Sequence, residues 1–445
     1  MILVSTKRAA PPVTFKEALL RGLAPDGGLY LPTSIPPVER ETLESWRGLS
    51  LAEVAVRVLS HLVGDEFDRS TLERLTREAF DFPAPTVPIA DGLSVLELFH
   101  GPTLAFKDFG ARFLARIFGS LLDERGGRAT ILVATSGDTG SAVAQGFHGV
   151  PRVRVVVLYP AGKVSPFQEA QMATLGGSVT AVRVPGTFDD CQRLVKTAFL
   201  DRHLGDLRLS SANSINIGRL LPQALYYVAS YLSVTPRVGE PIVFSVPSGN
   251  LGNLTAGVMA QCLGLPVRRF VAATNVNAVL PEYLETGTYR ARSSIATISN
   301  AMDVGDPSNF PRLLELHHGS LAELRKNLFG MAVSEEQTRE TLGAVYRRTG
   351  YTLDPHGAVG WTAADRYALS RDSTEPIITL ATAHPAKFAQ TVRQELGFEP
   401  ELPQAYRGVL ARPLLTEDLP STDYREFRDV LRAPWSERVG GGLLR

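Results

Sequence analysis

Six short apolar runs, separated by stretches with helical periodicity, constrain the fold more than any other feature of the chain. They cover residues 129–135, 153–160, 178–185, 241–247, 267–274 and 376–382. Each run is apolar throughout rather than alternating, as in strands that are buried on both faces. Such strands, joined by helices, are typical of a doubly wound α/β fold with mostly parallel sheets. Because ligands of these folds bind at the carboxyl ends of strands, we expect the chemistry in the loops that follow the runs.

The length of 445 residues predicts two or three domains. Residues 1–90 are predicted to form a mainly helical unit, with apolar periodicity over 51–62 and 72–80. Three prolines between positions 83 and 88 mark its end. Residues 91–396 then form the α/β region, divided into two subdomains, and 397–445 are predicted to be a C-terminal helical extension.

The charge balance argues for a small-molecule partner. Lys and Arg total 46, Asp and Glu also total 46, and the pI is about 7.1. Without a basic surplus, a nucleic-acid partner or a polybasic membrane contact loses its electrostatic basis, and no apolar run is long enough to span a bilayer. Two cysteines and the absence of a recognisable secretory signal favour the cytoplasm. The eight scattered histidines contain no metal-binding spacing, so no metal is expected.

Lysine is scarce: only seven occur among the 46 basic residues. Lys107 lies between two phenylalanines in HGPTLAFKDFG (100–110), at the predicted start of a helix. Apolar burial and the positive end of the helix dipole both disfavour the ammonium form, and a neutral amine is what Schiff-base chemistry requires. The structural alternative is a lysine that reaches solvent from a helix start or pairs with Asp108.

A glycine loop follows the run at 241–247 and precedes a helical stretch. It has the order of a phosphate-binding cup, in which backbone N–H groups at a helix start approach an anion. It differs from the dinucleotide fingerprint, and no nucleoside-triphosphate motif occurs, so dehydrogenase and NTPase functions are disfavoured. A tight turn without a ligand is the alternative. The loop residues are Ser248, Gly249, Asn250, Leu251, Gly252 and Asn253.

A second glycine loop follows the run at 129–135. Its small hydroxyl residues and free N–H groups suit a carboxylate, although an ordinary Ser or Asp helix cap would look the same. The loop consists of Ser136, Gly137, Asp138, Thr139, Gly140 and Ser141. At the end of the last strong run, Thr382 could offer its hydroxyl to a ligand or simply end the strand.

A third polar segment, SANSINIGRLLPQ (211–223), carries one arginine before a helix. Arg219 could hold a second anion with two hydrogen bonds, or it could belong to an ordinary surface loop. Taken together, a lysine in an apolar setting, a phosphate cup, a carboxylate loop and a second anion contact describe a pyridoxal-phosphate (PLP) enzyme that acts on a phosphorylated amino acid.

These segments also resemble the threonine synthase family, in its longer bacterial and fungal subgroup of fold-type-II PLP enzymes. The resemblance spans nearly the whole chain and includes GLAPDGGLYLP (22–32), FVAATNVN (270–277), SNAMDVGDPSN (299–309) and TAHPAKF (382–388), besides the segments above. It implies that residues 1–90 are the N-terminal domain typical of this family. Asp138 stands where many other fold-type-II enzymes carry Asn.

The resemblance implies a role for each candidate residue. Lys107 would form the Schiff base with PLP, residues 248–253 would hold its phosphate, Thr382 would bond its ring nitrogen, and Asp138 would lie near the ring. The residues implied for the substrate are Ser136, Gly137, Thr139, Gly140 and Ser141 for its carboxylate, Asn213, Ser214, Asn216 and Arg219 for its phosphate, and Lys163 as a further contact.

The implied activity is that of a lyase converting O-phospho-L-homoserine and water to L-threonine and phosphate. Another fold-type-II activity, a serine/threonine dehydratase or a phospholyase, is the alternative within the family. A non-catalytic ligand-binding relative is the alternative outside catalysis, and retention of Lys107 and both loops disfavours it. A monomer and a homodimer both agree with the sequence.

Overall fold

The six apolar runs are strands of two separate sheets in the computed structural model, which describes residues 1–370 and 374–434. This confirms the predicted α/β class with mostly parallel sheets. The strand ends agree with the predicted runs to within a residue or so. The strands are β6 (Ala129–Ala134), β7 (Val153–Pro160), β8 (Val179–Val184), β10 (Ile242–Pro247), β11 (Val267–Thr274) and β13 (Ile377–Ala381).

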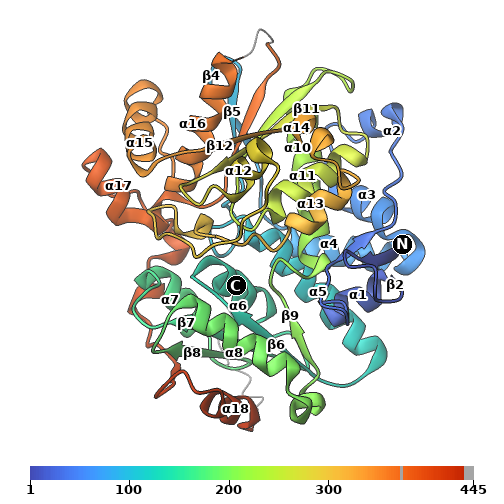
Figure 1. The fold of residues 1–445 in the computed structure, drawn as a ribbon, viewed down its shortest axis with the longest axis vertical. Helices are drawn as coiled ribbons and strands as arrows, with labels where there is room; N and C mark the ends of the chain where they lie inside the picture. The colour runs from blue at the N-terminus through green and yellow to red at the C-terminus, as the bar shows by residue number, and fades with distance from the viewer. Residues whose placement is uncertain (371–373, 435–445) are drawn as a thin grey trace.

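The five-stranded sheet has the order β14-β8-β7-β6-β9, and all its neighbouring strands are parallel. It occupies the lower half of Figure 1. Its remaining strands are β9 (Leu209–Ser211) and β14 (Thr416–Asp418). The helical segments of this half are α6 (Asp138–Phe147), α7 (Pro166–Ala173), α8 (Phe188–Leu200), the short η2 (Arg202–Leu207) and α18 (Tyr424–Arg432).

The six-stranded sheet has the order β12-β11-β10-β13-β5-β4. Only the edge strand β4 runs antiparallel to its neighbour among the described strands of this sheet, and Pro88 lies within it, where a missing N–H is tolerated. The additional strands are β4 (Thr86–Ala90), β5 (Leu93–Glu97) and β12 (Leu328–Ala332). The helical segments after residue 223 in this half are α10 (Ala224–Val234), α11 (Gly252–Cys262), α12 (Val279–Thr286), η4 (Asn300–Met302), α13 (Phe310–Leu316), α14 (Leu321–Asn327), α15 (Glu335–Thr349), α16 (Pro355–Leu369), η5 (Pro385–Phe388) and α17 (Ala389–Leu396).

The N-terminal region contains the two predicted helices and a small sheet that was not predicted. The segments with apolar periodicity form α3 (Leu51–Val63), which begins with a Ser50/Glu53 capping box, and α4 (Arg69–Ala79). The small antiparallel sheet has strands of two to four residues, too short to show a period of two. The other elements are β1 (Ile2–Ser5), β2 (Val13–Thr14), α1 (Phe15–Arg21), β3 (Tyr30–Pro32), α2 (Arg40–Glu44) and η1 (Gly64–Glu66).

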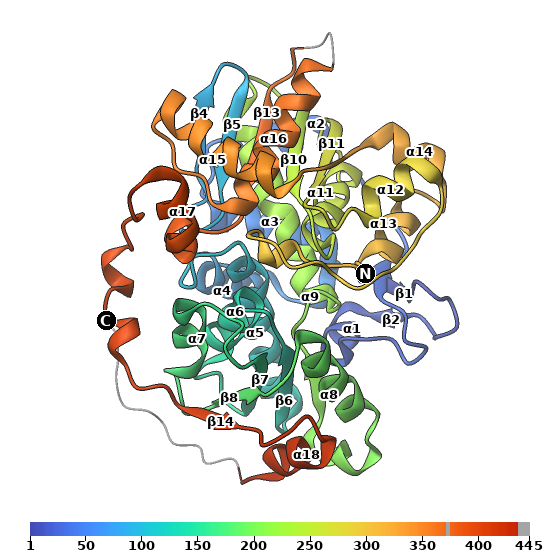
Figure 2. The ribbon, with the colours of Figure 1, turned by 60° about the vertical axis from the view of Figure 1, so that its left-hand side comes forward.

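The C-terminal segment is helical only in part. It passes through the turns η6 (Gln404–Tyr406) and η7 (Val409–Ala411), adds β14 to the edge of the five-stranded sheet, and ends in α18 (Figure 2). Arg154 of β7 donates hydrogen bonds to the carbonyl oxygens of Val430 and Leu431, which ties the end of α18 to the sheet. Residues 435–445 of the predicted extension lie outside the described residues.

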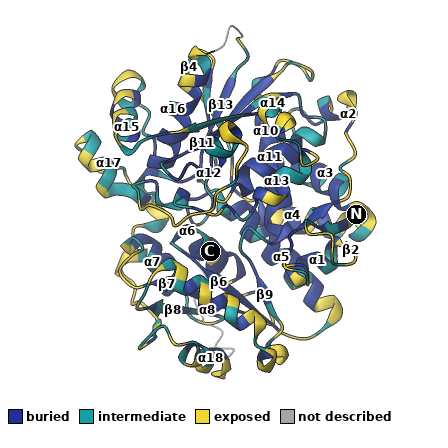
Figure 3. Ribbon diagram, in the orientation of Figure 1, coloured by how far each residue is buried: buried dark blue, intermediate teal, exposed yellow. Residues whose placement is uncertain are grey.

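Helix α5 (Lys107–Arg125) joins the two halves of the molecule. It follows β5 of the six-stranded sheet and packs against α6 of the other sheet and against α9 (Ile217–Leu220), which continues into η3 (Leu221–Gln223). One apolar core runs from the N-terminal helices through α5 to both sheets. The strands β6, β7, β10 and β13 are buried throughout, whereas α15, α17 and α18 expose their outer faces (Figure 3). None of the helices in the described ranges is long and apolar enough to cross a membrane.

Candidate active site

Lys107 is the first residue of α5, as the sequence predicted. The chain before it turns sharply, with Leu104 in the left-handed region at φ 58°, and Ala105 then forms an isolated β-bridge with Ala383. The Phe106 N–H donates a 2.9 Å hydrogen bond to the carbonyl oxygen of Thr382. The end of β13 is therefore clamped to the start of α5, which brings Thr382 close to Lys107 along the backbone.

The Lys107 amine lies in an environment that favours its neutral form. Its side chain is only 15% exposed, and its Nζ lies 4.0 Å from Oδ2 of Asp138. Burial lowers the pKa of Lys107 to about 8; Asp138 opposes this shift, while the charges of Lys387 and Arg219 reinforce it. Roughly a tenth of this amine is therefore unprotonated at pH 7, far more than for an ordinary lysine, and the neutral form is the one a nucleophile or a base requires.

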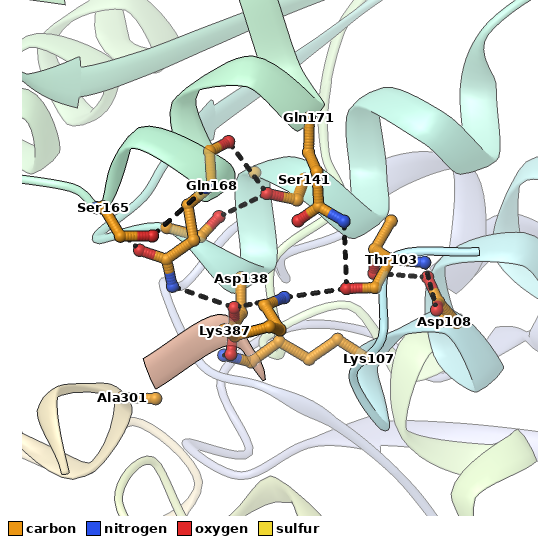
Figure 4. A network of polar contacts seen from close by, with 12 residues as sticks. Thr103, Lys107, Asp108, Asp138, Ser141, Ser165, Gln168, Gln171, Ala301 and Lys387 are labelled. Carbon is orange, nitrogen blue, oxygen red and sulfur yellow. Dashed lines mark hydrogen bonds and ion pairs between the residues drawn. The ribbon is translucent and has the colours of Figure 1, made fainter. Parts of the chain in front are cut away.

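A second lysine, Lys387 of η5, reaches the same carboxylate. Its Nζ lies 2.6 Å from Oδ1 of Asp138, and its side chain is fully buried (Figure 4). Gln168 of α7 donates to the same oxygen at 2.9 Å. Burial acts to raise the pKa of Asp138, but the charges of Lys387 and Lys107 outweigh it and hold that pKa well below its usual range.

No role was predicted for Lys387 from the sequence. Two signals pointed to it: the scarcity of lysine in the chain, and its position five residues after Thr382 in a segment that follows a buried strand. Gln168 carried no such signal, because it lies in α7 and reaches Asp138 of α6 from another segment of the chain.

Thr103 forms a hydrogen-bonded frame beside these charges. Its carbonyl oxygen accepts from Lys387 Nζ at 2.8 Å and from Gln171 Nε2 at 3.2 Å. Its N–H and hydroxyl donate to the Asp108 carboxylate at 2.8 and 2.7 Å (Figure 4). Burial raises the pKa of Asp108 to about 6, although the hydrogen bonds from Thr103 oppose the shift. Asp108 thus pairs with Thr103 rather than with Lys107, the partner considered from the sequence.

The loop 248–253 presents unused donors at the start of α11. Among the residues that the structure describes, none of the N–H groups of 249–253 makes a hydrogen bond, and Leu251 is in the left-handed region at φ 61°. A Cβ on Gly249 would lie 2.9 Å from the Cα of Met302, so the 299–304 segment packs directly on the loop. The Asn253 Nδ2 is buried without a partner. Successive free amides at a helix start suit a phosphate group.

The loop 136–141 divides into two parts. The Gly140 N–H donates to the Thr135 hydroxyl at 2.9 Å, and the Ser141 hydroxyl donates to the carbonyl oxygens of Gly137 and Gln168. Ser136 and Thr139 are partly exposed, and their hydroxyls make no hydrogen bond within the described ranges. The side chains available to a ligand are therefore those of Ser136 and Thr139.

The 211–219 segment contributes both structural and available groups. The Asn216 amide is fully used: it donates to the carbonyl oxygens of Leu19 and Ser211 and accepts from the Gly218 N–H. Arg219 is 3% exposed and donates to the Ala212 carbonyl oxygen at 2.7 Å, but its Nε is buried without a partner.

The same segment contains two further predicted contacts, Asn213 and Ser214. The Asn213 Oδ1 is also buried without a partner. Ser214 lies beside the phosphate loop, since a Cβ built on Gly252 would be 3.6 Å from its own Cβ. Ser214 thus borders the loop 248–253, the Arg219 side chain packs against Gly110 of α5, and Asn216 holds the backbone that carries them.

The last two predicted positions differ in their surroundings. Thr382 is 6% exposed, and its hydroxyl makes no hydrogen bond to any described residue. Lys163 lies exposed in the turn after β7, apart from the buried charges around Asp138. Within residues 1–370 and 374–434, no group of His, Cys, Asp and Glu side chains is arranged to hold a metal ion.

Known protein families match most of the chain between residues 3 and 431. Three family models match: Threonine synthase N terminus over residues 3–80, Pyridoxal-phosphate dependent enzyme over 91–382, and Threonine synthase, C-terminal over 357–431. The threonine synthase of Serratia marcescens is 44% identical over 423 residues, which cover 94% of this chain and 96% of that protein.

Solved structures of this kind superpose closely. The PLP-bound threonine synthase of Brucella melitensis has a TM-score of 0.92 at 39% identity, covering 97% of this chain and 99% of that one. The threonine synthase of Escherichia coli has a TM-score of 0.90 at 42% identity, with the same coverage.

Proposed function

The chain belongs to the threonine synthase family of PLP-dependent enzymes, and from this premise we propose that it converts O-phospho-L-homoserine and water to L-threonine and phosphate, the last step of threonine biosynthesis. The observation that carries the proposal is the Lys107 amine, shifted towards its neutral form at the junction of the two sheets. It is a lyase reaction on a phosphate ester of a small amino acid.

The residues present fit PLP. Unused amides at 249–253 can hold its phosphate, the Lys107 amine can bond covalently to its aldehyde, and the free hydroxyl of Thr382 can bond its ring nitrogen. Asp138 lies beside Lys107 and so would border the ring. When bound, PLP supplies an electron sink that acidifies the C–H bonds next to the amino group of the substrate.

The chain itself moves protons and holds two anions. The Lys107 Nζ takes the proton from the α carbon, because its lowered pKa leaves a neutral amine available. Loss of a β proton, departure of phosphate from Cγ, protonation at Cγ, addition of water at Cβ and return of a proton to the α carbon then complete the conversion.

The two substrate anions are assigned to different groups. We propose that Ser136 and Thr139 bind the substrate carboxylate together with nearby N–H groups. The hydroxyls of these two residues have no partner among the described residues. The substrate phosphate is assigned to Arg219 with Asn213 and Ser214, since the buried Nε of Arg219 lacks an acceptor. Lys163, which is exposed, is a peripheral contact in this proposal.

The competing reaction stops after elimination, as in a dehydratase or phospholyase, and gives 2-oxobutanoate and ammonia. Incubation of the PLP-loaded protein with O-phospho-L-homoserine and chromatography of the products separates the two. We expect threonine and phosphate in equal amounts, and a predominance of 2-oxobutanoate would overturn the proposal.

We also propose a cytoplasmic location. Cys191 and Cys262 are both free, and burial raises the pKa of each thiol, as expected for structural cysteines in a reducing compartment. Fractionation of the host cell would test this location, with recovery in the cytosolic fraction as the expected result.

A further inference from the structure

One buried carboxylate faces two lysine amines. Lys387 Nζ lies 2.6 Å from Oδ1 of Asp138, and Lys107 Nζ lies 4.0 Å from Oδ2. The Lys387 side chain is 0% exposed, whereas that of Lys107 is 15% exposed. Figure 4 shows both side chains converging on Asp138 from different elements, η5 and α5.

The hydrogen bonds show which amine carries the proton. Lys387 donates to Asp138 and to the carbonyl oxygen of Thr103 at 2.8 Å, so its ammonium has two acceptors. Lys107 has no hydrogen-bond acceptor within the described part of the chain. A buried ammonium is tolerated only when it is paired and hydrogen-bonded, so the geometry favours the ammonium form at Lys387 over that at Lys107.

Charge balance leads to the same assignment. The groups that face Lys107 are Asp138 from α6, Lys387 from η5 and Arg219 from α9, and Asp108 on its own helix is turned to Thr103. One Asp138 carboxylate balances one ammonium. A second ammonium on Lys107 would add an uncompensated charge next to Lys387 and Arg219.

We propose that Lys387 is a positioning residue that occupies the Asp138 carboxylate and thereby favours the neutral, nucleophilic form of the Lys107 amine. Without Lys387, Asp138 would pair with Lys107 instead, and the proton would move to the amine that the reaction needs free. The inference rests on the proposed function for its meaning, since it concerns the same site. It adds a residue and a role that the function itself does not require.

The experiment measures the protonation of Lys107 directly, in the full-length chain freed of PLP. Limiting acetic anhydride acetylates neutral amines, and mass spectrometry after digestion gives the extent of acetylation at each lysine across a series of pH values. Lys326, whose side chain is 80% exposed, serves as the internal reference. The midpoint of Lys107 acetylation is expected below that of Lys326 in the wild-type chain.

Three variants are expected to shift the midpoint of Lys107 acetylation in distinct ways. Lys387→Met should raise the Lys107 midpoint by roughly 1 pH unit or more, because Asp138 is left with Lys107 as its partner. Asp138→Asn should lower the midpoint, because it removes the attractive charge and leaves that of Lys387. The double variant Lys387→Met with Asp138→Asn should fall below Lys387→Met alone.

Lys387→Arg is the matched control, since it retains the charge and should leave the midpoint within a few tenths of a pH unit. An unchanged or lowered midpoint in Lys387→Met would overturn the inference, as would a raised midpoint in Asp138→Asn. If thermal unfolding shows that Lys387→Met does not fold, Lys387→Gln takes its place, with the same expected rise in the Lys107 midpoint. The measurement needs neither PLP nor substrate, so failure of the proposed reaction would leave its outcome unaffected.

Discussion

Lys387 Nζ and the Asp138 carboxylate form a fully buried ion pair of 2.6 Å, although the two residues lie on helical segments that follow strands of different sheets, in distant parts of the chain. The pair joins the end of β13 to the start of α6. It places a fixed positive and a fixed negative charge next to Lys107, and the geometry of that contact depends on how the two halves of the molecule pack.

Replacing Asp138 by Asn is expected to destabilise the PLP-free protein by about 3–5 kcal/mol near neutral pH, because Lys387 is left as an unpaired buried charge. The pKa of Asp138 is held below its usual 3.8, so the stability that the carboxylate contributes is present above about pH 4 and is lost as the pH falls further. Urea unfolding of both proteins at pH 7 and pH 3.5 measures this. The difference in free energy of unfolding should shrink at the lower pH, and a difference that is constant with pH would contradict the assignment.

Replacing Lys107 by Ala is expected to abolish both the borohydride-reducible link to PLP and the formation of threonine, because no other described amine of the site is both neutral and partly exposed. Absorbance of the PLP link and product chromatography measure the two effects. Lys326→Ala, at an exposed lysine of α14, is the matched control and should retain both. Steady-state turnover by Lys107→Ala would refute the assignment.

Replacing Arg219 by Ala should raise the apparent KM for O-phospho-L-homoserine on the order of 10-fold or more, since a charge-assisted hydrogen bond to phosphate is lost. The affinity for PLP, followed by absorbance, should change little, because the amides at 249–253 are separate donors. A parallel loss of PLP would mean that Arg219 holds the cofactor phosphate rather than that of the substrate.

Replacing Thr382 by Asp should increase the share of 2-oxobutanoate and other by-products relative to threonine. A carboxylate would stabilise the protonated form of the PLP ring nitrogen more than a hydroxyl does. Protonation of that nitrogen strengthens the electron sink and opens side reactions. Thr382→Ser keeps the hydroxyl and is the control, with the wild-type product ratio expected. An unchanged ratio in Thr382→Asp would count against this contact.

Replacing Gly249 by Ala should weaken PLP binding about 10-fold or more, because the added Cβ would lie 2.9 Å from the Met302 Cα and 3.0 Å from the Ala301 carbonyl oxygen. Backbone atoms cannot move aside as side chains do, so the amides must shift. Equilibrium dialysis with PLP measures the loss. Gly408→Ala, where nothing lies within 4 Å of the added Cβ, should bind PLP as the wild type does.

The sequence was sufficient for features that depend on local patterns. Continuous apolar runs identified the six strands, and a lysine between phenylalanines at a helix start identified Lys107. The same reasoning missed the N-terminal sheet, because strands of two to four residues carry no period. It also listed Asn216 among ligand contacts, although its amide holds the backbone of Leu19 and Ser211.

What the sequence determined by itself is therefore the fold class and the family, since strand burial, glycine loops and a helix-start lysine are patterns of neighbouring residues. Only the tertiary structure decided which charges meet. The pairing of Lys387 with Asp138 follows from how η5 and α6 pack across the two halves of the molecule. The protonation of a buried amine depends on every charge within a few ångströms, whatever its distance along the chain.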